Sequence, residues 1–234
     1  MQAQYYDEFS VLEQMFQFII PKYHEAHDIM TSMLDYQSSG ELRIVDLGSG
    51  FGDLSRRIMH MFPNSLVFGI ERETAILQRA MQKMEDHSDR FIPKDRDLDN
   101  NAWMHELERI DAVVSSFTLD YLTLERHQQV VKEAFDLLSE NGRWISCEFF
   151  RSEDNRINRV FHDLEMKFIQ KAILDGKVSQ EQVEQLSQST ILRNPHHVCS
   201  VEDKMEWLDR AGFRHIDIPW KFLNLAVLSG VKQE

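Results

Sequence analysis

The chain has 234 residues, of which 42% are hydrophobic and 28% charged, and this composition is typical of a globular protein with a core of its own. Its 26 basic residues are outnumbered by 39 acidic ones, for a net charge of −13, which disfavours nucleic acid as a partner because a phosphate backbone would be repelled. Two cysteines and the lack of an apolar run of about 20 residues argue against a disulfide framework and a membrane span, so we expect a reduced, cytoplasmic protein outside the membrane.

Apolar side chains between residues 10 and 35 recur at helical spacing, with a break at Pro21, which predicts two amphipathic helices before the first strand. A β-branched run at 42–47 then stops at a glycine cluster, and helical spacing resumes at 54–62. A second strand at 65–71 is again followed by a helical pattern. An alternation of strands and helices therefore begins near residue 42.

The alternation continues with a weaker strand at 90–95, a helical stretch at 103–107, a fully apolar strand at 110–117, a helix at 124–138 and a fifth strand at 143–150. Repeated strand-helix units predict a parallel sheet with right-handed crossovers.

The alternation of strands and helices ends in the last third of the chain. Residues 151–195 are helical and highly charged with no strand-like run, which predicts an inserted helical cap. A helix at 201–211 ends at Gly212, and runs at 213–219 and 222–229 predict an antiparallel pair of strands.

A glycine-rich loop, D-L-G-S-G-F-G at 46–52, lies between a predicted strand and a predicted helix. Glycine there lets the backbone turn tightly and approach a ligand, and the amides at the helix N-terminus favour an anionic group. Glu71 closes the second strand about 20 residues later, where a carboxylate can accept hydrogen bonds from both hydroxyls of a ribose. Together these features indicate a nucleoside-binding site, although a plain strand-to-helix turn and a surface glutamate would look the same in isolation.

Four motifs in order make the chain similar to the class I S-adenosylmethionine-dependent methyltransferases. V-D-L-G-S-G-F-G resembles the first motif of that family, Glu71 its ribose-binding acid, Asp97-Leu98 its adenine-binding pair, and D-A-V-V-S-S-F at 111–117 its fourth-strand motif. The resemblance implies an α/β fold, with a Rossmann-like, doubly wound, mostly parallel seven-stranded sheet, an antiparallel last strand, N-terminal helices and a helical cap insertion. It also implies one S-adenosylmethionine-binding domain over 1–234, with a helical lid at 1–40 and the cap at 151–198.

By the same resemblance, the cofactor is S-adenosylmethionine, and its parts are assigned to successive motifs. Asp46, Gly48 and Gly50 would face the methionine part, Glu71 and Arg72 the ribose, Asp97 and Leu98 the adenine, with Asp95 as a competitor of Asp97. Ser115, Ser116 and Phe117 would lie on the sulfonium side. The expected cofactor-binding residues are Tyr6, Asp46, Gly48, Ser49, Gly50, Glu71, Arg72, Asp97, Leu98, Ser115, Ser116 and Phe117.

A looser likeness extends over most of the chain, to carboxy-S-adenosylmethionine synthases, which serve tRNA wobble-uridine modification. It is carried by Y-D-E-F near the start, the helical insert, S-V-E-D-K-M-E-W-L-D-R-A-G-F at 200–213 and F-L-N-L-A-V-L at 222–228. Those enzymes have Lys-Arg-Ser near the end of the insert, where this chain has Gln188-Ser189-Thr190. Because a carboxylated sulfonium would lack its cationic partner, we expect the ordinary cofactor.

Methyl transfer depends mainly on bringing the nucleophile and the methyl group together, so the motifs predict binding residues and no single catalytic residue. Tyr5 and Tyr6 are interpreted either as an N-terminal lid with an aromatic face near the sulfonium or as a hydrophobic staple. His162, His196 and His197 are candidate general bases or structural histidines, and a metal site is rejected because no ligand spacing accompanies them. The expected substrate-binding residues are Tyr5, Tyr121, Glu148, His162, Trp220 and Asn224.

The leading hypothesis is an enzyme that methylates a small molecule, amino-acid-like or a secondary metabolite. The alternatives keep the cofactor and change the reaction, to an intramolecular cyclisation or to the carboxy-S-adenosylmethionine type of tRNA wobble modification, or keep only the fold as a non-catalytic binding module. A basic patch for a small RNA stem, built from Lys22, Arg56, Arg57, Arg156 and Arg159, and a homodimer are left open.

Overall fold

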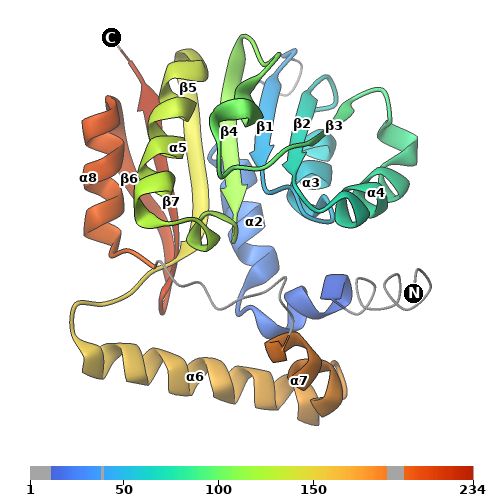
Figure 1. Cartoon of the computed structure of the whole chain (residues 1–234), viewed down its shortest axis with the longest axis vertical. Coiled ribbons are helices and arrows are strands. Elements are labelled where there is room, and N and C mark those ends of the chain that lie inside the picture. The colour runs from blue at the N-terminus through green and yellow to red at the C-terminus, as the bar shows by residue number, and fades with distance from the viewer. Residues whose placement is uncertain (1–11, 38–39, 189–197, 234) are drawn as a thin grey trace.

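The body of the protein is one seven-stranded sheet, seen in a computed structural model that describes residues 12–37, 40–188 and 198–233 (Figure 1). The strands lie in the order β3-β2-β1-β4-β5-β7-β6, and β7 runs antiparallel to both of its neighbours. This confirms the predicted mostly parallel α/β sheet with an antiparallel last strand. The strands are β1 (Arg43–Leu47), β2 (Leu66–Glu71), β3 (Phe91–Asp95), β4 (Ile110–Ser116), β5 (Leu138–Phe149), β6 (Phe213–Phe222) and β7 (Leu225–Lys232).

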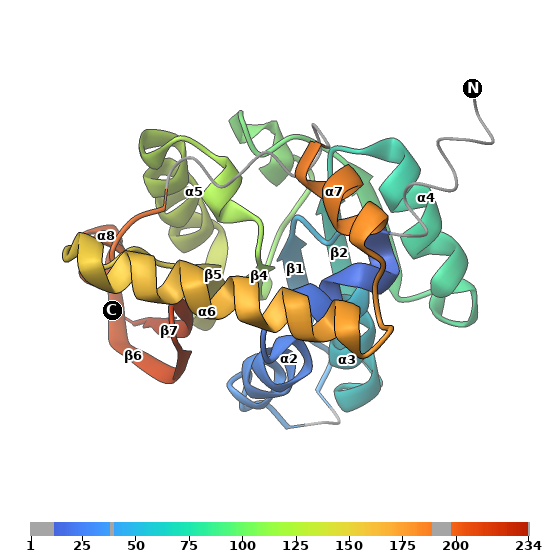
Figure 2. The same cartoon turned by 90° about the horizontal axis from the view of Figure 1, so that it is seen from below.

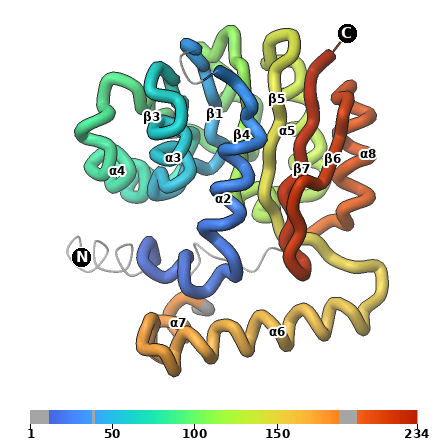
Figure 3. The backbone as a smooth tube through the Cα atoms, turned by 180° about the vertical axis from the view of Figure 1, so that it is seen from behind, coloured from blue at the N-terminus to red at the C-terminus, as the bar shows by residue number. Residues whose placement is uncertain are grey.

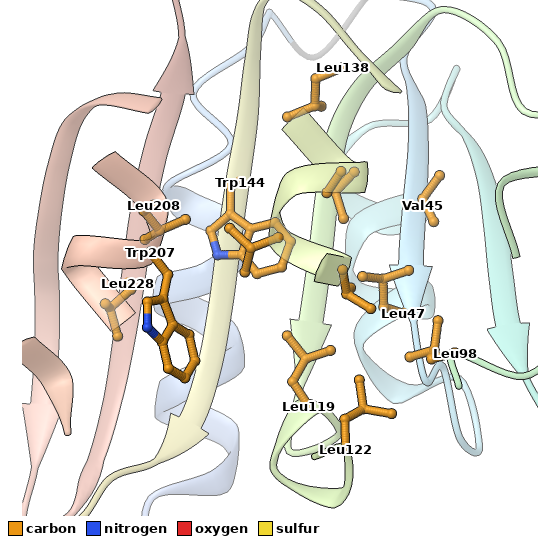
Figure 4. Close-up of a cluster of buried hydrophobic side chains, with 14 of the residues drawn as sticks. Val45, Leu47, Leu98, Leu119, Leu122, Leu138, Trp144, Trp207, Leu208 and Leu228 are labelled. Carbon is orange, nitrogen blue, oxygen red and sulfur yellow. The ribbon is translucent and has the colours of Figure 1, made fainter. Parts of the chain in front are cut away.

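Helices cover both faces of the sheet (Figures 2 and 3). One face carries α2 (Tyr23–Ser32), α3 (Asp53–Met61) and α4 (Thr74–Lys83), whose apolar sides form a core with the inward side chains of β1 and β2. The other face carries α5 (Leu124–Leu137) and α8 (Val201–Ala211), which enclose a second core around Trp144 and Trp207 (Figure 4). Burial on both faces explains why the central strands read as continuous apolar runs in the sequence.

The boundaries of α8 show how local sequence signals fix an element. Ser200 Oγ accepts a hydrogen bond from the backbone N–H of Asp203, and the Asp203 carboxylate accepts one from the N–H of Ser200, both at 3.0 Å. This capping box satisfies two donors that a helix start leaves unpaired. At the other end Gly212 takes φ +113°, so the helix ends there as predicted.

Several predicted elements differ in detail, and the last two strands each end three residues later than predicted. β5 begins at Leu138, five residues before the predicted start at Arg143, because Leu138 still pairs with Ile110 across an irregularity in the β4–β5 ladder. The predicted helical stretch at 103–107 is the short 3₁₀ helix η2 (Asn101–Met104). Two more such turns are η1 (Glu85–His87) and η3 (Leu119–Tyr121), and η3 follows β4 at the edge where ligands bind in this fold class.

The predicted insertion is helical, as α6 (Asn155–Leu174) and α7 (Gln180–Gln188), and α6 crosses below the carboxyl ends of the parallel strands (Figure 1). Ala172 is the buried residue of α6, whereas several of its large apolar side chains are exposed. Residues 12–19 form a helix that packs Met15 against Ala172 and Val178, which connects the insertion to the N-terminal part of the chain. In the part of the chain that the structure describes, no helix has the length and apolarity needed to cross a membrane.

Candidate active site

The loops that follow β1, β2, β3 and β4 line one pocket at the carboxyl ends of these strands. Because the strands are adjacent in the order β3-β2-β1-β4, the motifs that are far apart in the sequence become neighbours in space. This is the position at which doubly wound sheets bind ligands. Among the residues of its wall that the sequence predicted are Asp46, Gly48, Ser49, Gly50, Glu71, Arg72, Asp97, Leu98, Ser116, Phe117 and Tyr121.

The glycine loop between β1 and α3 forms the floor of the pocket. Gly48 takes φ +66°, and a Cβ built on it would lie 2.1 Å from Cγ2 of Thr118. The Thr118 hydroxyl donates a hydrogen bond to the Gly48 carbonyl at 3.2 Å, so the two loops are held in direct contact. Only glycine meets both the backbone conformation and the close approach at this position.

Asp46, near the end of β1 and at the start of the glycine-rich motif, is a nearly inaccessible carboxylate, 1% exposed. Its Oδ2 accepts a hydrogen bond from the Ser55 hydroxyl on α3 at 2.6 Å. Burial raises the pKa of Asp46 to about 7, although the Ser55 hydrogen bond opposes the shift. The pocket therefore holds an acid that is only partly ionised at neutral pH until a cationic group joins it.

This raised pKa gives a prediction for stability. Because the folded-state pKa of about 7 lies above the ordinary 3.8, the folded protein binds the proton more tightly, and its free energy of unfolding falls as pH rises between these two values. We expect Asp46→Asn to raise the free energy of unfolding by about 2 to 4 kcal/mol at pH 8 and by progressively less as the pH approaches 4.

Urea unfolding at pH 5 and pH 8 checks this, with Asp86→Asn on the exposed turn η1 as the matched control. A variant at position 46 that loses stability equally at both pH values would contradict the assignment of a buried, proton-binding carboxylate.

Glu71, at the end of β2, is oriented by backbone donors. Its Oε2 accepts from the Gly50 N–H at 3.2 Å and its Oε1 from the Glu73 N–H at 2.9 Å. Burial raises the pKa of Glu71, while these backbone hydrogen bonds oppose the shift. The carboxylate is thus fixed beside the glycine loop with further acceptor capacity toward the pocket.

The end of the pocket near β3 contains Asp97 and Leu98, the pair expected at the adenine. Leu98 is buried, and Asp97 Oδ1 accepts from the Asp99 N–H at 2.9 Å. Asp95, its competitor for the adenine role, is exposed and instead accepts a hydrogen bond from the Thr74 hydroxyl at 2.8 Å. The geometry therefore favours Asp97. Arg72 and Arg96 are the cationic residues of the described pocket wall.

The opposite end of the pocket is walled by four rings, from Tyr23 and His27 on α2, Phe117 after β4 and Phe149 on β5; we call this set the aromatic wall. Tyr23 stacks on Phe117 with centroids 5.7 Å apart, and Phe149 lies 5.8 Å from Phe117. His27 Nε2 shares a hydrogen bond of 2.8 Å with Ser116 Oγ. Burial lowers the pKa of His27 to about 3, so this ring is neutral at physiological pH.

Asp53 lies between the aromatic wall and the solvent-facing side of α3. It accepts a hydrogen bond from the Tyr23 hydroxyl at 3.1 Å and pairs with Lys83 at 2.8 Å. Burial alone would raise the pKa of Asp53, but the Lys83 and Tyr23 contacts outweigh burial and lower it. Burial and the Asp53 charge raise the pKa of Tyr23, so the pair is a phenol donating to an ionised carboxylate.

Sequence reasoning did not select Tyr23, His27, Asp53 or Phe149 as site residues. The four-residue spacing of Tyr23 and His27 on one helix places both on the same face. That spacing is the one sequence signal for these two residues as a pair, and it does not show which part of the protein this face of the helix contacts.

Five predicted site residues lie outside this pocket. Ser115 is buried and donates to the Leu47 carbonyl at 3.1 Å, and Glu148 is fully buried in an ion pair with Lys204 at 2.9 Å. His162 is exposed on α6. Trp220 Nε1 donates to Glu25 at 2.9 Å, and Asn224 Nδ2 donates to Glu165 on α6 at 2.6 Å. Trp220 nevertheless packs in one apolar cluster with Tyr23, Phe117 and Phe149 beside the pocket, and its role toward a substrate, like that of Asn224, stays a prediction.

Some predicted residues lie outside the described part of the chain. These are Tyr5 and Tyr6 of the expected lid, Ser189 and Thr190 at the end of the insert, and His196 and His197. Their assignments stay predictions.

Comparisons with known proteins agree with this arrangement. A family model described as a methyltransferase domain matches residues 44–142. The carboxy-S-adenosyl-L-methionine synthase of Nautilia profundicola is 21% identical over 223 residues, covering 95% of this chain and 91% of that protein. The enzyme of the same name from Staphylococcus epidermidis is 23% identical over 219 residues, covering 91% and 89%.

Among solved structures, an O-methyltransferase family protein from Burkholderia thailandensis has a TM-score of 0.66 at 11% identity; the match covers 93% of this chain and 59% of that one. The magnesium protoporphyrin IX methyltransferase of Synechocystis, solved with bound S-adenosylmethionine, has a TM-score of 0.60 at 15% identity, covering 93% and 83%. Residues 44–142 therefore match a methyltransferase domain, and the resemblance of the chain to the class I S-adenosylmethionine-dependent methyltransferases, with carboxy-S-adenosylmethionine synthases as relatives of low identity, is confirmed.

Proposed function

We propose that this protein binds S-adenosylmethionine in the pocket and transfers its methyl group to a small molecule. The observation that carries the proposal is the Glu71 carboxylate, held by the N–H groups of Gly50 and Glu73 beside the glycine loop. A carboxylate at the end of the second strand, next to a glycine-rich loop, is suited to the two hydroxyls of a ribose.

In this proposal the order of the strands sets the orientation of the cofactor. The adenine lies toward β3, against Asp97 and Leu98, the ribose lies at Glu71 after β2, and the methionine part lies over the loop after β1. The sulfonium then faces the aromatic wall after β4. Aromatic faces attract a cation by about 1 kcal/mol or more when water is excluded, and the partly ionised Asp46 adds a negative charge below the methionine part.

The aromatic wall also supports the ordinary cofactor over its carboxylated form. A carboxylate attached at the sulfonium would need a cationic partner nearby. In the described part of the wall around Phe117 the neighbouring side chains are apolar or aromatic apart from His27, which is neutral there; they are Phe16, Ile19, Ile20, Tyr23, Phe149, Trp220 and Leu225. These neighbours favour a methyl-accepting substrate with an apolar or aromatic part over a polyanionic substrate.

Methyl transfer in this pocket requires little from the protein beyond position. As the acceptor atom bonds to the methyl carbon, the bond from that carbon to sulfur breaks, and S-adenosylhomocysteine is released as an uncharged thioether. An acceptor hydroxyl or amine must also lose a proton. The lowered pKa of Asp53 makes it a weak base, so the proposal assigns no general base in the described wall and leaves the proton to water or to the acceptor's own ionisation.

A second candidate function is carboxy-S-adenosylmethionine synthesis. It is favoured by the length of the match to the synthases, which extends over 95% of this chain and 91% of the Nautilia protein at 21% identity. The proposal of one cofactor-binding domain over 1–234, with a lid at 1–40 and a cap at 151–198, is common to both candidates. An intramolecular cyclisation of the cofactor and a non-catalytic module are the remaining alternatives.

Product analysis separates these functions. We would incubate the full chain with S-adenosylmethionine carrying an isotopically labelled methyl group and a pool of small metabolites, and identify products by mass spectrometry. The proposal predicts S-adenosylhomocysteine together with a labelled small molecule. A carboxylated sulfonium would instead support the synthase, methylthioadenosine would support cyclisation, and binding without turnover would support the non-catalytic module.

A further inference from the structure

A cluster of four fully buried polar side chains lies on the α5–α8 side of the sheet, outside the pocket. It consists of Asp120 on η3, His127 on α5, Glu148 on β5 and Lys204 on α8, each at most 1% exposed. Lys204 Nζ lies 2.9 Å from Glu148 Oε1 and also contacts His127 Nε2, and His127 Nε2 lies 3.3 Å from Glu148 Oε2. Four elements thus place ionisable groups at one point of the interior, where a charge without a partner has a large desolvation penalty.

A metal ion does not account for this cluster. Asp120, His127 and Glu148 offer donor atoms within 4.8 Å of one another, which would suit a cation. The ammonium group of Lys204 already contacts two of the three residues and lies 5.0 Å from the centre of the Trp144 ring. The chain therefore supplies its own cation at this place.

Asp120 connects the cluster to the pocket. Its Oδ2 accepts a hydrogen bond from the backbone N–H of Phe149 at 2.9 Å, while Oδ1 has no hydrogen-bond partner within the described residues. Phe149 belongs to the aromatic wall, and Tyr121, the next residue after Asp120, also lines the pocket. The Asp120 carboxylate thus connects the part of the pocket wall that η3 contributes to the part that β5 contributes.

We propose that Lys204 is a positioning residue: as the internal counter-ion of Glu148 it keeps Asp120 bonded to Phe149, and it thereby holds the pocket wall of Tyr121 and Phe149 in the shape that binds the cofactor. Burial and the Glu148 charge raise the pKa of Asp120 well above its ordinary value, so Asp120 favours its protonated form, and without Lys204 the Glu148 carboxylate would be left in a dry interior without a cation, where it must take up a proton or move. The inference rests on the proposed function, because its main readout is cofactor binding.

Removal of Lys204 should make the shape of the pocket wall, and with it the affinity for the cofactor, dependent on pH. The titratable or charged groups that face the cluster are Asp120 from η3, His127 from α5, Cys147 and Glu148 from β5, Cys199 before α8, and Asp203 and Lys204 from α8. Burial first, and then the charge of Lys204, lowers the pKa of His127. Once Lys204 is gone, a proton bound by His127 or shared by the two carboxylates can replace the lost cation at low pH only.

The test compares S-adenosylhomocysteine binding by calorimetry at pH 6 and pH 8 in full-length variants. We expect Lys204→Met to bind about tenfold more weakly at pH 8 and to recover most of the loss at pH 6, because the uncompensated buried charge is removed by a proton. The double variant E148Q/K204M, which removes both charges, should recover most of the affinity at both pH values. Lys132→Met, in an exposed ion pair with Asp136 on α5, is the matched control and should bind like the wild type.

The Asp120 contact is tested by its own pair of variants. Asp120→Asn keeps an oxygen that accepts from Phe149 and should bind well, whereas Asp120→Leu removes it and should bind several-fold more weakly. Should Lys204→Met prove insoluble, this pair decides the proposal.

Folded Lys204→Met protein that binds as the wild type does at both pH values, or Asp120→Leu protein that binds as tightly as Asp120→Asn, would overturn the inference. If the wild type itself binds no cofactor, the proposed function fails and unfolding temperatures still test the cluster. A charge role predicts that Lys204→Met loses more stability at pH 8 than at pH 6, and a packing role predicts equal losses.

Discussion

Replacing Glu71 by alanine is expected to weaken S-adenosylhomocysteine binding by about 100-fold or more, since two hydrogen bonds to a charged acceptor contribute roughly 1.5 to 3 kcal/mol each. The loss has a second source, because Glu71 also orients the Gly50 and Glu73 N–H groups at 3.2 and 2.9 Å. Glu71→Gln keeps one carbonyl acceptor and should lose less, about tenfold. Calorimetric titration measures both, and Glu85→Gln on the exposed turn η1 is the matched control.

The pH dependence of binding gives an independent check on the same carboxylate. Burial raises the pKa of Glu71 in the free protein, so affinity should fall as the pH is lowered through that raised value, because the protonated acid has lost acceptor capacity. The Glu71→Gln variant should lose this part of the acid-side decline. If Glu71→Ala bound within about twofold of the wild type at pH 7.5, or if the variant kept the full acid-side decline, the ribose role would be wrong.

Replacing Gly48 by alanine is expected to remove cofactor binding and to lower the free energy of unfolding by about 2 to 4 kcal/mol. The backbone at φ +66° disfavours any Cβ by about 1 to 2 kcal/mol. The new methyl would also lie 2.1 Å from Cγ2 of Thr118, and overpacking of this kind costs about 1 to 3 kcal/mol. Relief of that contact must displace the loop after β1 or the loop after β4, and both line the pocket.

Gly176 offers a control with the same backbone angle. It also takes φ +66°, but a Cβ there would meet nothing within 4 Å. Gly176→Ala should therefore show the backbone contribution alone, about 1 kcal/mol in urea unfolding, with cofactor affinity unchanged. Equal effects of the two substitutions on binding and stability would contradict the close contact between Gly48 and Thr118.

The sequence predicted those parts of the site that depend on chain order. Periodicity located the strands, and in a parallel sheet the strand ends meet at one edge, so the loop at 46–52, Glu71 and Asp97 were brought together as expected. Each of these residues lies at the end of a strand or in the loop that follows it. Their positions relative to one another therefore follow from topology alone.

The parts that were missed depend on which way a side chain points. Successive residues of a strand face opposite sides of the sheet, and the strand at 143–150 is apolar enough on both sides that the pattern does not show which is which. Glu148 was predicted at the substrate, but it points to the α5–α8 side, and its neighbour Phe149 points into the pocket. Ser115 and Ser116 divide in the same way, since only Ser116 reaches His27 and the pocket.

The aromatic wall was missed for a related reason. Tyr23 and His27 reach the pocket because α2 packs across β4 and β5, a contact between segments about 90 residues apart in the chain, as the hydrogen bond between His27 and Ser116 shows. No local pattern encodes such a docking. The same holds for Lys204, whose partners Glu148 and His127 come from two other elements.

The most direct test of the account is a titration of purified full-length protein with S-adenosylmethionine and, separately, with S-adenosylhomocysteine, followed by calorimetry at pH 7.5. We predict saturable binding of one molecule of either ligand per chain, with each ligand preventing the binding of the other. A folded protein that binds neither ligand would contradict the claim that the pocket formed by Glu71, the glycine loop and the aromatic wall is a site for this cofactor.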